Sequence, residues 1–228
     1  MNSDTLDKPE IGAGGNTRQR LLLTALQLYA RDGLRAVSLR SISAAAGSKN
    51  SAAMHYHFGN KLGVVDALVH MIAEELAAIA ADIHAQMPGR GSLREEFRKS
   101  LLPLVTLSHS QPWGADAVRF LSRAISETDP EISAAINPVS RDFWQRVDKS
   151  LSLLVPNLPD EIRQLRLMFM SVNVIHGIAE TASLAYTPLG DLSHLRNEQL
   201  LDHLVDYLIG GLMAPSHGSN PFNTERSH

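Results

Sequence analysis

Apolar residues spaced three and four positions apart recur along almost the whole chain of 228 residues. Strict alternation of apolar and polar residues, which is typical of a half-buried strand, does not occur, and runs of β-branched residues are scarce. A spacing of three and four places apolar side chains on one side of a helix. The sequence therefore predicts an all-α protein.

The first part of the chain carries the signals of three short helices, over 17–32, 38–46 and 50–58, and of a long helix that follows them. Residues that cap or end helices stand at each boundary: Asn16 or Thr17 and Gly33, Ser38 and Gly47, Asn50 or Ser51, and Gly59 with Asn60. The long fourth helix has an apolar stripe, formed by Leu62, Val65, Leu68, Val69, Ile72, Leu76 and Ile79.

Proline and glycine divide the rest of the chain into further helices, predicted over 92–108, 113–127, 138–154, 160–186 and 197–213. Ser92 and Glu95 have the spacing of a capping box, and Pro103 is expected to kink its helix or to mark an earlier end. The terminal stretches lack this pattern. We expect a disordered arm over 1–16, a head domain over 17–63, a larger helical domain over 64–213 and a disordered tail over 214–228.

The charge of the chain is divided unevenly. Residues 11–63 carry seven basic side chains and one acidic side chain, whereas residues 64–228 carry thirteen basic and twenty acidic ones. A basic head on an acidic body is what a protein shows when only the head meets a polyanion such as DNA. Chance clustering of surface charge would give the same pattern.

Cysteine is absent from the sequence, which excludes disulfides and thiolate metal sites and fits a reducing cytoplasm. The apolar runs are far shorter than the roughly 20 residues of a membrane span, and the N-terminus has no signal segment. We expect a soluble, cytoplasmic protein that does not enter a membrane.

The stretch 47–61, GSKNSAAMHYHFGNK, brings the basic charge together with a helix–turn–helix pattern. Its second helix begins with small and polar residues, which suit entry into the major groove. Candidate contact residues are Lys49, Asn50, Ser51, Ala52, His55 and Tyr56, while Met54, Phe58 and Leu62 continue the inward stripes. His55 and His57 could suggest a metal pair, but we do not expect one, because positions i and i+2 of a helix point apart and no third ligand lies nearby in the sequence.

Residues 17–61 resemble the tetracycline-repressor (TetR) family of bacterial transcriptional regulators. The resemblance rests on Arg-Asp-Gly-Leu (31–34), Val-Ser-Leu-Arg-Ser-Ile (37–42), Ala-Ala-Gly (45–47) and Met-His-Tyr-His-Phe-Gly-Asn-Lys (54–61). It implies that His55, Tyr56, His57 and Lys61 contact operator DNA and that Ser38 and Arg40 hold phosphates. Arg31 and Arg35 are more simply read as a solvated face.

The sequence departs from the family pattern at two places. The span from Gly47 to Phe58 is one residue longer than the commonest family turn, which leaves open which of Lys49, Asn50 and Ser51 reads a base. His55 stands where the family most often has a tyrosine, so a contact made there depends on protonation.

For the larger domain, the resemblance implies a small-molecule pocket and a homodimer formed by the last two helices. Candidate pocket residues are His109, Trp113, Phe120, Phe143, Met168, Val172, Asn173 and His176. The helix over 160–186 is expected to bury Leu165, Met168, Phe169, Val172, Ile175 and Ala179, and the last helix carries a near coiled-coil seam of Leu201, Leu204, Val205, Leu208 and Leu212. Gly177, Gly210 and Gly211 would allow close helix approach. We expect a largely apolar effector, and no cofactor or metal.

The function that the resemblance implies is therefore that of a dimeric repressor, which a small molecule releases from a palindromic operator. A ligand-dependent activator of the same fold, a plain monomeric core and a helical-bundle interaction protein without DNA binding remain as alternatives. Enzyme motifs such as a phosphate-binding glycine loop, a Ser-centred elbow or HExxH are missing from the sequence. We therefore expect no catalytic activity.

Overall fold

The computed structural model describes residues 13–215 apart from 49, 51, 90 and 196, and its regular elements there are helices. In chain order they are α1 (Ala13–Asp32), α2 (Leu39–Ala45), α3 (Ala53–Phe58), α4 (Lys61–Gln86), α5 (Leu93–Ser110), α6 (Gly114–Ile125), α7 (Pro130–Leu154), α8 (Asp160–Ala179), the 3-10 helix η1 (Thr181–Tyr186) and α9 (Asn197–Met213). The all-α prediction is confirmed. Over the described part of the chain, no helix combines the length and apolarity needed to cross a bilayer.

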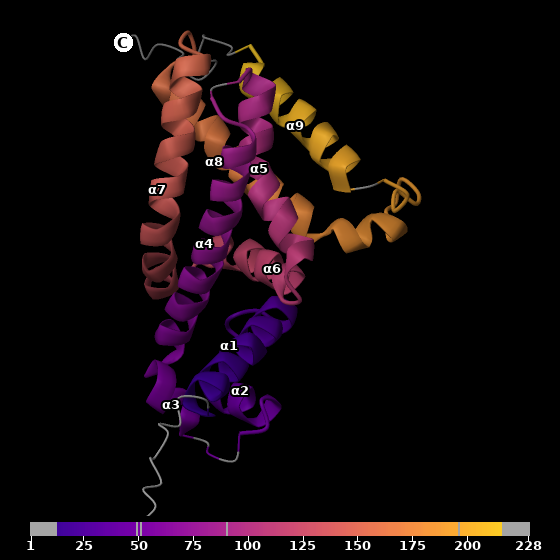
Figure 1. Ribbon diagram of the computed structural model, residues 1–228. Helices are drawn as coiled ribbons and strands as arrows, with labels where there is room; N and C mark the ends of the chain where they lie inside the picture. The colour runs from indigo at the N-terminus through magenta and orange to yellow at the C-terminus, as the bar shows by residue number, and fades with distance from the viewer. Residues whose placement is uncertain (1–12, 49, 51, 90, 196, 216–228) are drawn as a thin grey trace, which may run out of the picture.

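The helices form a small head at one end of an elongated body (Figure 1). The head consists of α1, α2 and α3, and α4 starts in the head and runs up through the body beside α7 (Figure 1). In the body α5 packs against α4, α6 and α9, while α8 packs mainly against α6. The head therefore meets the body through two helices, α4 and α6, which both contact α1.

The apolar side chains gather in two cores. The first core joins Leu26 and Tyr29 of the head to Leu68 of α4 and Phe120 of α6. The second core lies deeper in the body, among α5, α8, α9 and the end of α7. Because the first core crosses the boundary predicted between residues 63 and 64, the head is not packed separately from the body.

Pro138 lies inside α7 and does not mark the start of this helix. The helix begins at Pro130, where the Asp129 carboxylate accepts hydrogen bonds from two N–H groups of the first turn, and it runs through Pro138. A proline within a helix costs about 3 kcal/mol, chiefly through a lost hydrogen bond. Burial of Ile132 and Ile136 in the first core offsets this cost. The predicted start of this helix at residue 138 is wrong.

The helix predicted over 160–186 ends at Ala179 and continues only as the tighter turn η1. Thr181 Oγ1 donates to a carbonyl of the last turn of α8, and Ser183 Oγ donates to the Glu180 carboxylate at 3.1 Å. Hydroxyl and carboxylate side chains that bond locally in this way compete with the backbone bonds of a helix. The prediction is therefore wrong beyond residue 179.

Two other boundaries involve residues singled out in the sequence. α5 opens with the predicted capping box, in which Ser92 N donates to the Glu95 carboxylate at 2.6 Å, and it continues through Pro103 without the earlier end that we had allowed for. α1 begins at Ala13, so residues 13–16 form a helical turn and not part of a disordered arm. The low helix propensity of the two glycines at 14 and 15 gives no reason for that extension.

Candidate nucleic-acid interface and internal cavity

Short side chains hold the start of α2. Ser38 is extended, and its hydroxyl accepts from Ser41 N at 3.1 Å while the Ser41 hydroxyl accepts from Ser38 N at 3.0 Å. This reciprocal pair is a capping box. Gly47 adopts a φ of 65°, which suits glycine and turns the chain out of the helix. The predicted start and end of this helix at Ser38 and Gly47 are confirmed.

The turn that leads into α3 is organised by Asn50. The Asn50 side-chain oxygen accepts from the N–H of Ala52 at 2.9 Å, and its carbonyl accepts from the N–H of Ala53 at 3.1 Å. Asn50 thus satisfies a free N–H as predicted, although α3 itself starts only at Ala53. Lys49 and Ser51, two of the candidate contact residues, lie outside the described residues.

α3 has an inward face and an outward face. Met54 and Phe58 are buried in the first core, as predicted. Tyr56 is 85% exposed, and the exposed Ala52 and His55 lie beside it at the helical spacing i, i+3 and i+4. The outward face contributes little to the packing of the head, which leaves it available to a partner.

His57 does not share that outward face. It is half-buried and lines a groove against α1 and α4, together with Arg18 and Asp66. Its ring contacts Tyr56 edge-on, with ring centres 5.0 Å apart. Of the three aromatic residues assigned to DNA by resemblance, His55 and Tyr56 face outward and His57 lies at the side.

A close backbone approach fixes Lys61 relative to α3. Lys61 is the first residue of α4, and the Asn60 side chain caps that helix by accepting from Gly63 N at 2.9 Å. A Cβ on Gly63 would lie 2.0 Å from the carbonyl oxygen of Phe58, so the junction requires glycine. The predicted cap at Asn60 is confirmed.

The arginines of the head differ in whether they form an ion pair within the chain. Arg40, on the first turn of α2, is exposed and forms no ion pair with the described residues. Arg31 pairs with Asp32 at 2.8 Å, and Arg35 pairs with Glu127 at 2.7 Å. The Arg35 guanidinium lowers the pKa of the Glu127 carboxyl by hydrogen bonding to it. Arg40 and the exposed Ser38 beside it therefore remain available to phosphate.

The eight residues predicted to line an effector pocket are not brought together. Of these eight, only Phe143 lines the cavity described below. Phe120 is fully buried and stacks on Tyr29 in the first core. The remaining members lie elsewhere: His109, Met168, Val172 and Asn173 are exposed, Trp113 packs on the first core, and His176 bonds to α6.

The orientation of α8 accounts for most of the difference between the predicted lining residues and those of the cavity. The helix is apolar on two sides, and periodicity alone does not say which side faces the core. The side predicted to be buried is largely exposed, with Leu165 at 46%, Met168 at 54%, Phe169 at 54% and Val172 at 43%. The buried side of α8 consists of Arg163, Leu167, Met170, Val174, Ile178 and Ala179.

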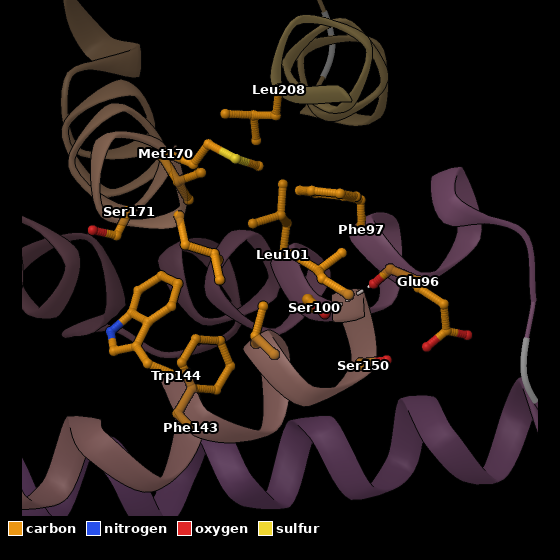
Figure 2. Close-up of a pocket in the computed structure, with 14 residues that line it drawn as sticks. Glu96, Phe97, Ser100, Leu101, Phe143, Trp144, Ser150, Met170, Ser171 and Leu208 are labelled. Atoms are coloured by element: carbon orange, nitrogen blue, oxygen red, sulfur yellow. Dashed lines mark hydrogen bonds between the residues drawn. The ribbon is translucent and has the colours of Figure 1, made fainter. Parts of the chain in front are cut away.

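A narrow apolar cavity lies between α5, α7, α8 and α9 (Figure 2). Its volume is about 40 Å³, which is room for about three water molecules. Its walls are mainly aliphatic and aromatic: Phe97, Leu101, Phe143, Trp144, Val147, Leu151, Leu167, Met170, Val174 and Leu208. Apart from Phe143, these residues are not among those predicted to line a pocket, because their spacing is the same as in any helix core.

Polar groups at the rim of the cavity are satisfied within their own helices. Ser100 Oγ donates to the Glu96 carbonyl at 2.8 Å, and Ser171 Oγ donates to the Met168 carbonyl at 2.7 Å. The Glu96 carboxylate accepts from Lys99 Nζ at 3.2 Å and points away from the apolar side chains (Figure 2). The cavity therefore offers an apolar surface to any occupant.

Polar contacts on two sides of α6 connect the head to α8. Arg123 donates to the carbonyls of Ala30 and Arg31 at the end of α1, at 2.7 Å and 2.9 Å. Ser122 Oγ lies 2.6 Å from Nδ1 of His176 on α8, and Ser126 Oγ lies 3.2 Å from Nε2 of the same ring. α6 thus bonds to the end of α1 through Arg123 and to α8 through Ser122 and Ser126.

α8 and α9 leave apolar and small residues at the surface. Besides the exposed side of α8, Tyr207 of α9 is 64% exposed. A Cβ added to Gly177, Gly210 or Gly211 would meet nothing within 4 Å. The seam predicted on α9 is not part of this surface, because Leu201, Val205, Leu208 and Leu212 are buried within the chain in the second core. That part of the expectation is wrong.

Two family models match the chain. The model described as "Bacterial regulatory proteins, tetR family" matches residues 21–68, and the model described as "Tetracyclin repressor-like, C-terminal domain" matches residues 100–211. The first covers the helix–turn–helix and the start of α4. The second covers the cavity lining, apart from Glu96 and Phe97, and the exposed side of α8. The curated proteins include no match to this chain.

Solved structures share the fold at low sequence identity. The fatty acid degradation regulator FadR from Bacillus halodurans is 15% identical, with 89% of this chain and 99% of that chain covered and a TM-score of 0.62. A TetR-family regulator from Bordetella parapertussis is 17% identical, with 85% and 94% covered and a TM-score of 0.61. The TetR-family regulator PfmR from Thermus thermophilus is 15% identical, with 88% and 98% covered and a TM-score of 0.58.

Proposed function

Because the chain belongs to the TetR family of DNA-binding transcriptional regulators, we propose that it acts as a dimeric repressor. In this proposal it binds a palindromic operator in the cytoplasm and is released by a small-molecule effector. The observation that carries the proposal is the outward face of α3, where Ala52, His55 and Tyr56 project from the basic head. The family is non-enzymatic.

The proposed contacts divide into base readers and phosphate binders. α3 enters the major groove with Ala52, His55 and Tyr56 toward base edges, and its slim start admits the helix to the groove floor. The turn before it adds Lys49, Asn50 and Ser51 to these candidates. Ser38, Arg40, His57 and Lys61 flank this face and bind phosphates, which fixes the orientation of the helix on the duplex.

Substitution of Tyr56 tests DNA binding without disturbing the fold. Tyr56→Ala should weaken binding to the DNA upstream of the gene by at least about tenfold in gel shift, because a residue on the contact face is lost. Tyr186→Ala is the matched control, since Tyr186 is 88% exposed on η1, which is not part of the head. Both variants should melt at the parent temperature. Equal binding by the two variants would refute the proposed interface.

Lys61→Ala separates phosphate binding from base reading. Removal of one phosphate contact should lower affinity on all sequences alike and should reduce the slope of log affinity against log salt by about 1 per head. Titration of the upstream duplex at several salt concentrations measures this slope. An unchanged slope would remove Lys61 from the proposed contacts.

We propose further that the exposed side of α8 forms the dimer interface with the outer side of α9. Four large apolar side chains exposed on one helix are unusual unless a partner covers them. Glycine at 177, 210 and 211 leaves open space over the surface, which permits close approach of the partner helices. Two heads related by twofold symmetry then read half-sites spaced by about one DNA turn, 34–36 Å, or a multiple of it.

The apolar cavity is the proposed effector site. With a volume of about 40 Å³ it is much smaller than a typical ligand pocket of roughly 300–1,000 Å³, so an effector enters by separating α5, α7 and α8. α8 bonds to α6 through His176, and α6 bonds to α1 through Arg123, which gives a path from cavity to head. The effector thus favours a head spacing that does not fit the operator.

Filling the cavity tests this mechanism. Leu101→Trp should retain operator binding and should no longer take up an environment-sensitive apolar dye, because the added ring occupies the space. Ile125→Trp is the control, since Ile125 is 39% exposed on α6 and is absent from the cavity lining. Dye uptake by Leu101→Trp at the parent level would place the effector site elsewhere.

A further inference from the structure

We infer that His55 identifies one base of the operator by accepting a hydrogen bond, at its ring Nε2, from the exocyclic amino group of that base. The inference rests on the proposed DNA binding by α3 and adds the chemistry of a single position. Cytosine N4 and adenine N6 carry such an amino group in the major groove. The readout is therefore of an amino group, whichever of the two bases supplies it.

The ring of His55 is held by the residue one helical turn later. Nδ1 of His55 lies 2.8 Å from the carbonyl oxygen of Gly59, and Gly59 N donates to the His55 carbonyl at 2.9 Å. A carbonyl oxygen can only accept a hydrogen bond, so Nδ1 carries the proton and donates it. Gly59 has a φ of 73°, a conformation that favours glycine, so the residue that ends α3 also fixes the histidine tautomer.

This tautomer leaves Nε2 as an acceptor. A neutral imidazole has one ring proton, and with that proton on Nδ1 the other nitrogen presents a bare lone pair. His55 is exposed, and within the described part of the chain the ring's hydrogen-bonding partner is Gly59. Nε2 is therefore available to accept a hydrogen bond from a partner that binds the outward face of α3.

The position of His55 on α3 determines which groups of the DNA can bond to its Nε2. It shares the outward face of α3 with Ala52, whose small side chain permits close approach to base edges. A lone pair is repelled by phosphate oxygens and by N7 and O6 of guanine, which are all acceptors. Those groups suit the donors Arg40 and Lys61 instead. An acceptor on this face matches the amino group of cytosine or adenine, as carboxylates do in other proteins.

Side-chain nitrogen NMR of the free protein tests the tautomer without any DNA. In spectra recorded at alkaline pH, the His55 signals should show the ring proton on Nδ1, the nitrogen beside the Gly59 carbonyl. The signals are assigned by their loss in His55→Phe. A proton on Nε2 would overturn the inference, because that nitrogen would then be a donor.

Base analogues test the readout itself. A duplex selected by the wild-type protein from random sequences is prepared with each half-site cytosine or adenine replaced in turn by an analogue without the major-groove amino group. At one symmetric pair of positions the wild type should lose roughly threefold to tenfold in affinity per half-site. His55→Phe should bind the normal and the modified duplex alike.

His84→Phe is the matched control, because His84 is exposed in the last turn of α4, outside the head, and its Nδ1 likewise lies 2.7 Å from a backbone carbonyl oxygen, that of Ala80. It should discriminate between the two duplexes as the wild type does. If His55→Phe discriminates as well as the wild type, or if it weakens binding equally on all sequences with a smaller salt slope, the ring does not read an amino group. Wild-type protein that binds no duplex at all would overturn the proposed function together with this inference.

Discussion

The Tyr29 hydroxyl is a buried polar group for which no described residue supplies a hydrogen bond. The side chain is fully buried, stacks on Phe120 of α6 and lies where the head meets the body. Burial raises the pKa of Tyr29 to about 12, so the hydroxyl stays neutral under ordinary conditions. An unpaired hydroxyl in this position costs stability, because its hydration is lost without a replacement.

Tyr29→Phe should therefore leave the protein as stable as the parent, or more stable by about 1 kcal/mol. Urea unfolding measures the free energy. Ser38→Ala provides the opposite case, since removal of the α2 capping hydroxyl should cost about 1 kcal/mol. A clear loss of stability in Tyr29→Phe would mean that the hydroxyl has a partner.

Some features of single residues could be predicted from the sequence and others could not. Helix boundaries that depend on local chemistry follow from the sequence: Ser38, Gly47, Asn60 and Ser92 stand at helix boundaries as predicted. The sequence predicts one contact set of His55, Tyr56 and His57, whereas the helix turns His57 toward α1 and α4. The tautomer of His55 could not be predicted, because it depends on where the carbonyl of Gly59 lies.

Among the helices, α6 carries the polar connections between head and body. Arg123→Ala should lower stability by about 1–2 kcal/mol, because the carbonyls at the end of α1 lose a cation that neutralises them. Arg119→Ala, one turn earlier on α6, should cost less than about 1 kcal/mol, since its pair with Asp116 lies at the surface at 3.6 Å. Urea unfolding compares the two variants, and equal losses would contradict a special role for Arg123.

α7 and α8 are tied by an ion pair at the buried Arg163. Its Nε donates to the Asp148 carboxylate at 2.7 Å, and Nη1 donates to Asp160 at 2.6 Å. The Arg163 guanidinium holds the pKa of the Asp148 carboxyl below its ordinary value of 3.8, chiefly by hydrogen bonding. A lowered pKa in the folded state stabilises the fold above the unfolded pKa and loses that effect as pH falls through the folded pKa.

Asp148→Asn should thus cost about 2 kcal/mol at neutral pH, and the cost should shrink as the pH falls through about 4 and below. Urea unfolding over a series of pH values gives the two curves. Asp116→Asn serves as the control, because its surface pair should contribute less than about 1 kcal/mol at any pH. Parallel curves for parent and Asp148→Asn would refute the assignment.

At the level of elements, helix positions could be predicted but helix orientation could not. Periodicity located α4, α5, α6 and α9 closely, whereas the prolines at 138 and 103 do not break their helices, because burial outweighs one lost hydrogen bond. α8 shows the main limit. With apolar residues on two sides, only contact with α5, α6, α7 and α9 decides that Leu167 and Met170 face inward and Phe169 outward.

The proposed dimer can be tested by placing a charge in its interface. Phe169→Glu places a charge on the exposed side of α8 and should convert a dimer to a monomer in sedimentation, with at least about tenfold weaker operator binding. Glu161→Gln, on the same helix but outside the exposed apolar residues, is the control. A variant that remains dimeric would exclude this face as the interface.

The small volume of the cavity also limits the rate at which the proposed effector can bind. A cavity of about 40 Å³ admits no molecule of drug size. If the proposed effector binds there, it must wait for the surrounding helices to separate, a collective motion on the scale of microseconds to milliseconds or slower. Above some dose, extra inducer then no longer speeds uptake, and the observed rate levels off at the rate of opening. Stopped-flow measurements would show this plateau. The rate of helix opening would then set the fastest rate at which the protein responds to the proposed effector.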